Sequence, residues 1–210
     1  MNHEPISNET SERLGFIFEQ VGDDLNTVRF DARPEGDPVV AFAFDILAFK
    51  LSSNSLSKNV FQKHKIPTLT VQLTREPEWR SLYPELKGPE MCVLHFGPNH
   101  DMGRFGYGIL GEEYMSKYLR RSSQTSSSIY FTAQNDREYK WKPTGPLIEC
   151  VDTHTRKWVA RYDARYAPPQ MQIKGDGVLI CTELMVTWYL FMNAKKWKWN
   201  IKTAKEIRAA

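Results

Sequence analysis

The stretch that decides the fold is Val178–Met192, VLICTELMVTWYLFM, whose only polar residues are Thr182, Glu183 and Thr187. It lacks the period-two alternation of a half-buried strand. As a helix it spans about 22 Å, at about 1.5 Å per residue, whereas a bilayer core is about 30 Å thick. A helix that is apolar on nearly every face belongs inside a protein. We therefore expect a buried core helix near residues 177–193, with a membrane helix and a pair of strands as the alternatives.

The chain before this helix contains short strand-like runs separated by turn residues. Residues 68–75, TLTVQLTR, alternate apolar and polar side chains, as in a strand with one buried face. Similar runs recur with Pro, Gly, Asn and Asp between them, which predicts antiparallel sheet or barrel rather than βαβ units. The other expected strands are LGFIFEQV (14–21), VVAFAF (39–44), MCVLHF (91–96), SIYFTA (128–133), REYKWK (137–142), LIECVD (147–152) and KWVARYD (157–163).

Composition indicates one globular domain. The chain has 210 residues, 41% hydrophobic and 12% aromatic, which suffices for a core without disulfides or a structural metal. We expect a flexible polar leader over 1–12, the domain over 13–194 and a basic segment over 195–210, which holds six Lys or Arg and one Glu. The net charge of +3 is too small to indicate a nucleic-acid partner. Oligomeric state is not addressed by the sequence.

Three widely spaced cysteines, Cys92, Cys150 and Cys181, form no CxxC pair and are odd in number. This predicts neither a disulfide framework nor a metal site, and no motif indicates a cofactor. The opening residues show no signal-peptide pattern. We therefore expect a cytoplasmic protein without a transmembrane span, with peripheral contact with a membrane left open.

Several motifs in the second half of the chain resemble a known family. They are YFTA (130–133), NDREYKWK (135–142), LIE (147–149), VARY (159–162) and Asp176 before the apolar helix. Together they resemble a fungal family of unknown function that is similar to the tubby C-terminal, scramblase and LURP-one-related proteins. The resemblance covers roughly residues 120–192. It implies a mainly β fold, a closed antiparallel β-barrel of about twelve strands around an apolar C-terminal helix. Residues 76–111 look like an insertion, or an elaboration particular to this chain, relative to that family.

Two polar features could carry chemistry. His95, His100 and Asp101 surround a Gly-Pro turn, and Glu183 interrupts the apolar helix. Imidazoles and a buried carboxyl can act as acid and base near neutral pH. One hypothesis is therefore a small-molecule enzyme, an isomerase, cyclase or hydrolase, that uses His95, His100 and Glu183 in a cavity. The alternative is a packed His95, and a Glu183 that reaches the rim or pairs with an arginine.

Two segments that combine basic and aromatic residues, 137–142 and 195–199, indicate ligand binding. Lys beside Trp suits a phospholipid headgroup interface, and also base stacking in RNA. For the first segment the alternative is an ordinary strand, with Tyr139 and Trp141 in the core and the charges outside. We expect first a binding module for phosphoinositide or another anionic lipid, then the enzyme of a small-molecule substrate, then a protein-interaction domain. The candidate ligand-binding residues are Arg137, Lys140, Lys142, Lys195, Lys196 and Trp197.

Overall fold

The computed structural model describes residues 15–32, 37–53, 65–84, 86, 88–107 and 111–209. Twelve described strands form one antiparallel sheet in the order β7-β6-β5-β4-β3-β2-β1-β12-β11-β10-β9-β8. Consecutive strands pair with each other except for β7 and β8, which are the two edges, and the first strand, β1, pairs with the last, β12. The strands are β1 (Gly15–Val21), β2 (Arg29–Ala32), β3 (Val39–Ser53), β4 (Lys65–Arg75), β5 (Met91–Phe96), β6 (Arg104–Gly106), β7 (Glu112–Tyr114), β8 (Ile129–Thr132), β9 (Glu138–Thr144), β10 (Leu147–Asp152), β11 (Trp158–Asp163) and β12 (Gln170–Lys174).

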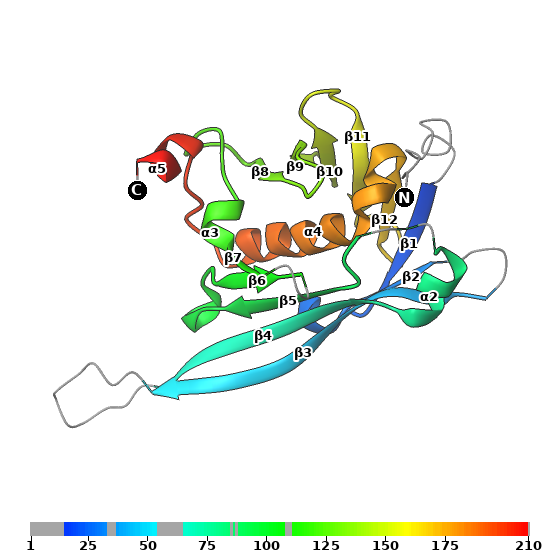
Figure 1. Cartoon of the computed structure of the whole chain (residues 1–210), viewed down its shortest axis with the longest axis horizontal. Helices are drawn as coiled ribbons and strands as arrows, with labels where there is room; N and C mark the ends of the chain where they lie inside the picture. The colour runs from blue at the N-terminus through cyan, green and yellow to red at the C-terminus, as the bar shows by residue number, and fades with distance from the viewer. Residues whose placement is uncertain are drawn as a thin grey trace, which may run out of the picture.

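The apolar stretch is a buried helix, as predicted. The chain turns through the 3-10 helix η4 (Gly175–Ile180) into α4 (Cys181–Lys196), and thirteen of the sixteen α4 residues are buried. Figure 1 shows α4 between strands β3–β6 and strands β8–β12. The stretch Gly175–Lys196 is long and apolar enough to cross a membrane, but 89% of its apolar window is buried inside this protein. The helix therefore forms the centre of the core.

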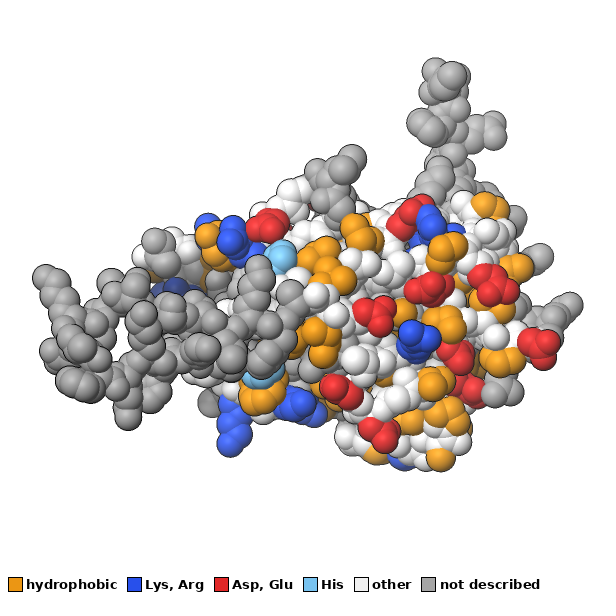
Figure 2. All heavy atoms as spheres, turned by 90° about the horizontal axis from the view of Figure 1, so that it is seen from below, with side chains coloured by type: hydrophobic (Ala, Val, Ile, Leu, Met, Phe, Trp, Pro, Cys, Tyr) orange, Lys and Arg blue, Asp and Glu red, His pale blue; other side chains and the backbone are white. Residues whose placement is uncertain are grey.

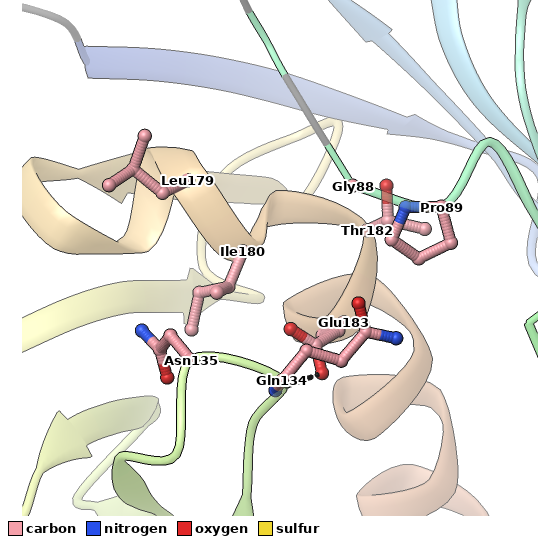
Figure 3. Close-up of a pocket in the computed structure, with 8 residues that line it drawn as sticks. All are labelled: Gly88, Pro89, Gln134, Asn135, Leu179, Ile180, Thr182 and Glu183. Atoms are coloured by element: carbon pink, nitrogen blue, oxygen red, sulfur yellow. Dashed lines mark hydrogen bonds between the residues drawn. The ribbon is translucent and has the colours of Figure 1, made fainter. Parts of the chain in front are cut away.

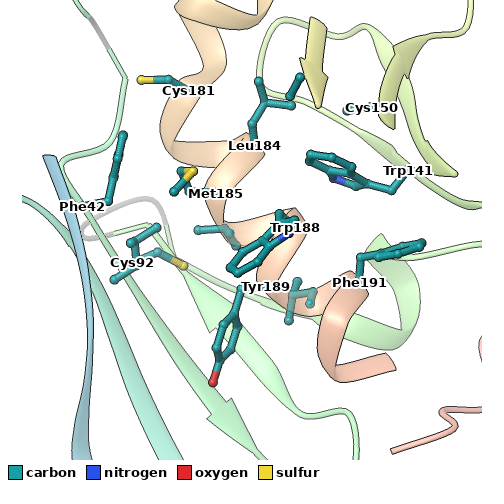
Figure 4. Packing of buried hydrophobic residues seen from close by; sticks show 14 of the residues in the cluster. Phe42, Cys92, Trp141, Cys150, Cys181, Leu184, Met185, Trp188, Tyr189 and Phe191 are labelled. Carbon is teal, nitrogen blue, oxygen red and sulfur yellow. The ribbon is translucent and has the colours of Figure 1, made fainter. Parts of the chain in front are cut away.

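Aromatic side chains from both halves of the sheet pack on α4 (Figure 4). Trp188 contacts Phe30 of β2 and Tyr162 of β11, each at a ring-centroid distance of 5.1 Å. The Thr187 hydroxyl accepts a hydrogen bond from Trp141 Nε1 of β9 at 2.9 Å, and donates one to the Glu183 carbonyl. One helix thus joins strands from both halves of the sheet in a single core.

The curled sheet is not closed by strand pairing. Its edge strands are β7 and β8, and no hydrogen-bonded ladder joins these two in the described residues. The short helix α3 (Met115–Tyr118) follows β7, and Arg120 then forms an isolated bridge with Tyr130 of β8. Arg121 forms a second isolated bridge, which is parallel, with Thr203, just before α5 (Ala204–Arg208). The twelve strands match the expected number, whereas closure as a hydrogen-bonded barrel is not seen.

Two segments that the sequence set apart take part in the fold. The described part of residues 76–111 supplies β5 and β6 of the sheet as well as the short helix α2 (Pro77–Leu82). In the basic segment over 195–210, Trp199 and Ile201 are buried in the core. Both segments therefore contribute apolar side chains to the core. The predicted leader over 1–12 lies outside the described residues.

Candidate functional site

His95 lies on the outer face of the sheet. Its neighbours Leu94 and Phe96 point inward and are buried, so the His95 side chain points away from α4. Its Nδ1 is 3.1 Å from the Thr70 hydroxyl, and its Nε2 is 3.6 Å from the Glu112 carboxylate. The imidazole therefore has ordinary surface partners.

His100 lies in the 3-10 turn η2 (Pro98–His100), near the C-terminal end of α4. Its ring stacks on Trp197 with centroids 4.2 Å apart and an interplanar angle of 6°. Its carbonyl accepts a hydrogen bond from Trp199 Nε1 at 2.8 Å. Partial burial, together with nearby Lys196, lowers the pKa of the imidazole. His100 therefore helps to fix the chain that follows α4.

Glu183 lies in the first turn of α4 and is only 2% exposed. One of its carboxylate oxygens, Oε1, accepts a hydrogen bond from the backbone N–H of Gln134 at 2.9 Å. Burial raises the pKa of this carboxyl to about 7. The helix N-terminus favours the ionised form, but a single hydrogen bond does not offset the loss of solvent.

The structure does not bring the two histidines to Glu183. Trp197, on which His100 stacks, follows Glu183 by about 20 Å along the helix axis. His95 points outward, on the far side of the sheet from the helix. The expected arrangement of His95, His100 and Glu183 around one cavity is therefore absent.

A small pocket of about 200 Å³ opens beside Glu183 (Figure 3). Three segments line it: the chain before β5, the turn after β8, and the junction of η4 with α4. The Thr182 hydroxyl lines it too, buried and without a hydrogen-bond partner among the described residues, although it lies close to the Cys181 thiol. The lining residues are Gly88, Pro89, Gln134, Asn135, Leu179, Ile180, Thr182 and Glu183.

The Arg137 side chain links three turns through contacts with Asp152 and Asp176, which we call the clasp. Its guanidinium bonds the Asp176 carboxylate at the start of η4, and lies 3.5 Å from the buried Asp152 carboxylate at the end of β10. The bond with Asp176 raises the pKa of Arg137. The expectation that Arg137 is free to bind a ligand therefore does not fit its contacts. Arg137 and Asp176 are both among the residues that carry the family resemblance, so that motif has a structural role here.

Lys140 and Lys142 lie on the outer face of β9, with Tyr139 and Trp141 buried behind them. Lys142 pairs with Glu149 of β10 at 3.4 Å. The Lys140 ammonium lies 5.6 Å from the centre of the Tyr130 ring on β8. The alternation predicted for this segment is confirmed, and it leaves both cations at the surface.

Lys140 belongs to a row of side chains that lie next to one another on neighbouring strands. The sequence did not reveal this row. On the outer face, Tyr130 pairs with Lys140, Lys140 with Val151, and Val151 with Trp158. The Lys174 ammonium of β12 then lies 3.7 Å from the centre of the Trp158 ring. We call Tyr130, Lys140, Val151, Trp158 and Lys174 the basic row.

A second cation covers the same tryptophan. The Arg161 guanidinium carbon is 4.4 Å from the centre of the Trp158 ring, and Arg161 is also paired with Glu149. Trp158 and Arg161 can share the outer face because the register shifts between Cys150 and Val151, which changes the alternation of β11. A bulge of this kind leaves no clear sequence signal, and β12 itself was not predicted.

The remaining candidates, Lys195, Lys196 and Trp197, lie at the C-terminal end of α4. Lys195 lies near the Phe191 ring at 5.8 Å, and Lys196 near the Trp197 ring at 5.2 Å. Lys174 directly precedes η4 and so belongs to the opposite end of the helix. The six predicted ligand-binding residues are therefore separated: Arg137 lies in the clasp, Lys140 in the basic row, Lys142 beside Glu149, and the other three at the end of α4.

Comparisons with known proteins identify no relative of this chain. No protein-family model matches the chain, and no curated protein and no solved structure matches it. Within the described residues, no group of three or more His, Cys, Asp or Glu side chains could hold a metal ion. The described cysteines, Cys92, Cys150 and Cys181, are buried and free.

Proposed function

We propose that the protein is a binding module for an anionic ligand, specifically the phosphorylated headgroup of a phosphoinositide or another anionic lipid. The observation that carries this proposal is the basic row. It presents Lys140 beside the Tyr130 ring and Lys174 beside the Trp158 ring, without a carboxylate within ion-pair distance of either ammonium in the described chain. Cations meet phosphate and rings lie at the headgroup boundary in such interfaces.

The distribution of charge along the chain supports binding of an anionic surface through the second half of the sheet. Residues 1–100 carry 14 acidic and 10 basic side chains, whereas residues 101–210 carry 11 acidic and 18 basic ones. Figure 2 shows one face of the molecule, with acidic side chains gathered on one half of it. An anionic surface would repel such a face and attract the strands of the second half.

A filled core favours binding at the surface over catalysis inside. The largest side chains around α4, such as Trp141 and Trp188, are fully buried and in contact. We also propose a tubby C-terminal-like barrel for this fold, supported by the twelve-stranded sheet curled round one apolar helix. Such a module would work in the cytoplasm, at the surface of a membrane.

The test is sedimentation with vesicles of phosphatidylcholine alone, with added phosphatidylserine, and with added phosphoinositide. We expect binding to the two anionic mixtures only. The double variant Lys140→Gln/Lys174→Gln should bind them about thirtyfold more weakly, since each cation near an anionic surface contributes about 1 kcal/mol. The matched control, Lys195→Gln/Lys196→Gln, removes two cations at the other end of α4. Equal loss in both variants, or equal binding to uncharged vesicles, would contradict the proposal.

A further inference from the structure

We propose that the pocket beside Glu183 binds a small organic amine in its protonated form. The ammonium group would lie against the Glu183 carboxylate, and a short carbon chain against Ile180 and Pro89. This site is separate from the basic row and does not depend on the proposed lipid binding.

The charge of the lining selects a cation. Among the eight residues that line the pocket, Glu183 is the one charged residue. Its Oε1 already accepts the Gln134 N–H, while Oε2 is the oxygen left for a ligand. A helix N-terminus alone would attract an anion, but a carboxylate in its first turn repels one. A metal ion is disfavoured because a single carboxylate is too small a ligand set.

The other polar groups fit the three donors of an ammonium. A primary ammonium has three N–H donors and no acceptor, so a buried one needs three acceptors. Glu183 supplies the first, and the Thr182 oxygen, buried beside the Cys181 thiol, supplies the second. The third is the side-chain oxygen of Gln134, another residue that lines the pocket. The Thr182 oxygen accepts no hydrogen bond from the described residues, and a donor brought by a ligand would supply one.

The pocket size limits the ligand. Its volume of about 200 Å³ is below the range of about 300–1,000 Å³ usual for drug-sized ligands. Ile180 and Pro89 provide the apolar part of the lining. A short alkylamine therefore fits better than a sugar or a nucleotide.

The experiment titrates the full ¹⁵N-labelled chain with n-butylamine at about pH 8, where Glu183 and the amine are both charged. n-Butanol serves as the uncharged probe of similar size. The reporter is the backbone amide of Gln134, because it donates to the Glu183 carboxylate. We expect a saturable shift of this signal with butylammonium and none with butanol.

Three variants separate this site from a water-filled cavity. Glu183→Gln keeps an acceptor for the Gln134 N–H, and it should weaken amine binding at least tenfold. Thr182→Val removes only the hydroxyl and should weaken it several-fold, with recovery in Thr182→Ser. Glu138→Gln alters a carboxylate that pairs with Arg120 outside the pocket, and should change nothing.

Three outcomes would overturn the proposal: no saturable shift, an equal response to butanol, or unchanged affinity in both Glu183→Gln and Thr182→Val. The double variant Lys140→Gln/Lys174→Gln should bind the amine as the unmodified chain does. Failure of lipid binding and failure of amine binding are therefore measured independently.

Discussion

At the scale of single residues, Glu183 couples stability to pH. Burial raises its pKa to about 7 in the folded chain, from the ordinary 4.5 that applies when the chain is unfolded. Between these values the folded protein keeps a proton that the unfolded chain has released, so the free energy of unfolding falls as pH rises. The difference corresponds to at most about 3 kcal/mol. We expect urea denaturation to show this loss between about pH 5 and pH 8 in the unmodified chain.

The matched variant is Glu183→Gln, whose amide does not titrate. Carboxyls with lowered pKa values, such as Glu149 and Asp163, oppose this trend at lower pH but are the same in both proteins. The difference between the two stability curves therefore isolates Glu183. Curves that stay parallel across this pH range would show that Glu183 is already ionised in the folded protein.

The sequence identified individual candidate residues better than their partners. Glu183 could be found because a carboxylate inside an apolar run is conspicuous. The Thr182 hydroxyl and the Gln134 N–H come to it only through folding. Likewise, Lys140 was found in a basic strand, whereas Trp158 and Lys174 joined it through pairing across strands far apart in the chain.

At the scale of elements, α4 should be the most sensitive segment. Leu184 is fully buried beside Cys181 and Met185, as Figure 4 shows. Leu184→Ala should lower the free energy of unfolding by about 2–5 kcal/mol, through lost burial and the cavity left behind. Leu184→Asp should abolish soluble expression, because it buries a charge without a partner.

The control for this prediction is Leu82→Ala in α2, a leucine that is 49% exposed. It should cost less than about 0.5 kcal/mol in the same urea titration. If Leu184→Asp stays soluble with an unchanged melting temperature, α4 is not the centre of the core.

Element length explains which parts of the fold the sequence predicted. Long apolar or alternating runs, such as those that form α4, β4 and β5, were predicted near their observed bounds. Short strands were missed: β2 has four residues, and β6 and β7 have three each. Three or four residues do not establish a period, so tertiary pairing decides their structure. The 3-10 start of the helix was also missed; there Gly177 lies so close to the Val159 carbonyl that a side chain would clash.

At the scale of the whole molecule, the arrangement follows from a contact that no local pattern contains. β1 pairs with β12, so the first and last strands meet and the sheet curls around α4. The family resemblance implied about twelve strands, whereas turn signals along the chain marked eight runs. Which edges meet was not predictable, since β7 and β8 are linked by α3 and an isolated bridge instead of a ladder.

The central helix should make the two halves of the sheet unfold together. Phe30 of β2 packs edge-to-face on Trp188, the same ring that Tyr162 of β11 contacts. Phe30→Ala should therefore lower the free energy of unfolding by about 3–5 kcal/mol, equally for the two halves of the sheet. Native-state hydrogen exchange should show protection falling by the same free energy in β9–β11 as in β2–β4.

This expectation is demanding for a chain of 210 residues, because two-state unfolding is usual only below about 150 residues. The matched control is Ile17→Ala on neighbouring β1, a side chain 55% exposed on the outer face, which should cost less than about 1 kcal/mol. A loss of protection confined to β1–β5 would show two folding units that merely share a helix. An equal loss in both halves is expected because the buried side chains of α4 pack on strands from both halves of the sheet. If one half opens, the apolar surface of α4 that it covered becomes exposed to water, and the other half cannot cover it.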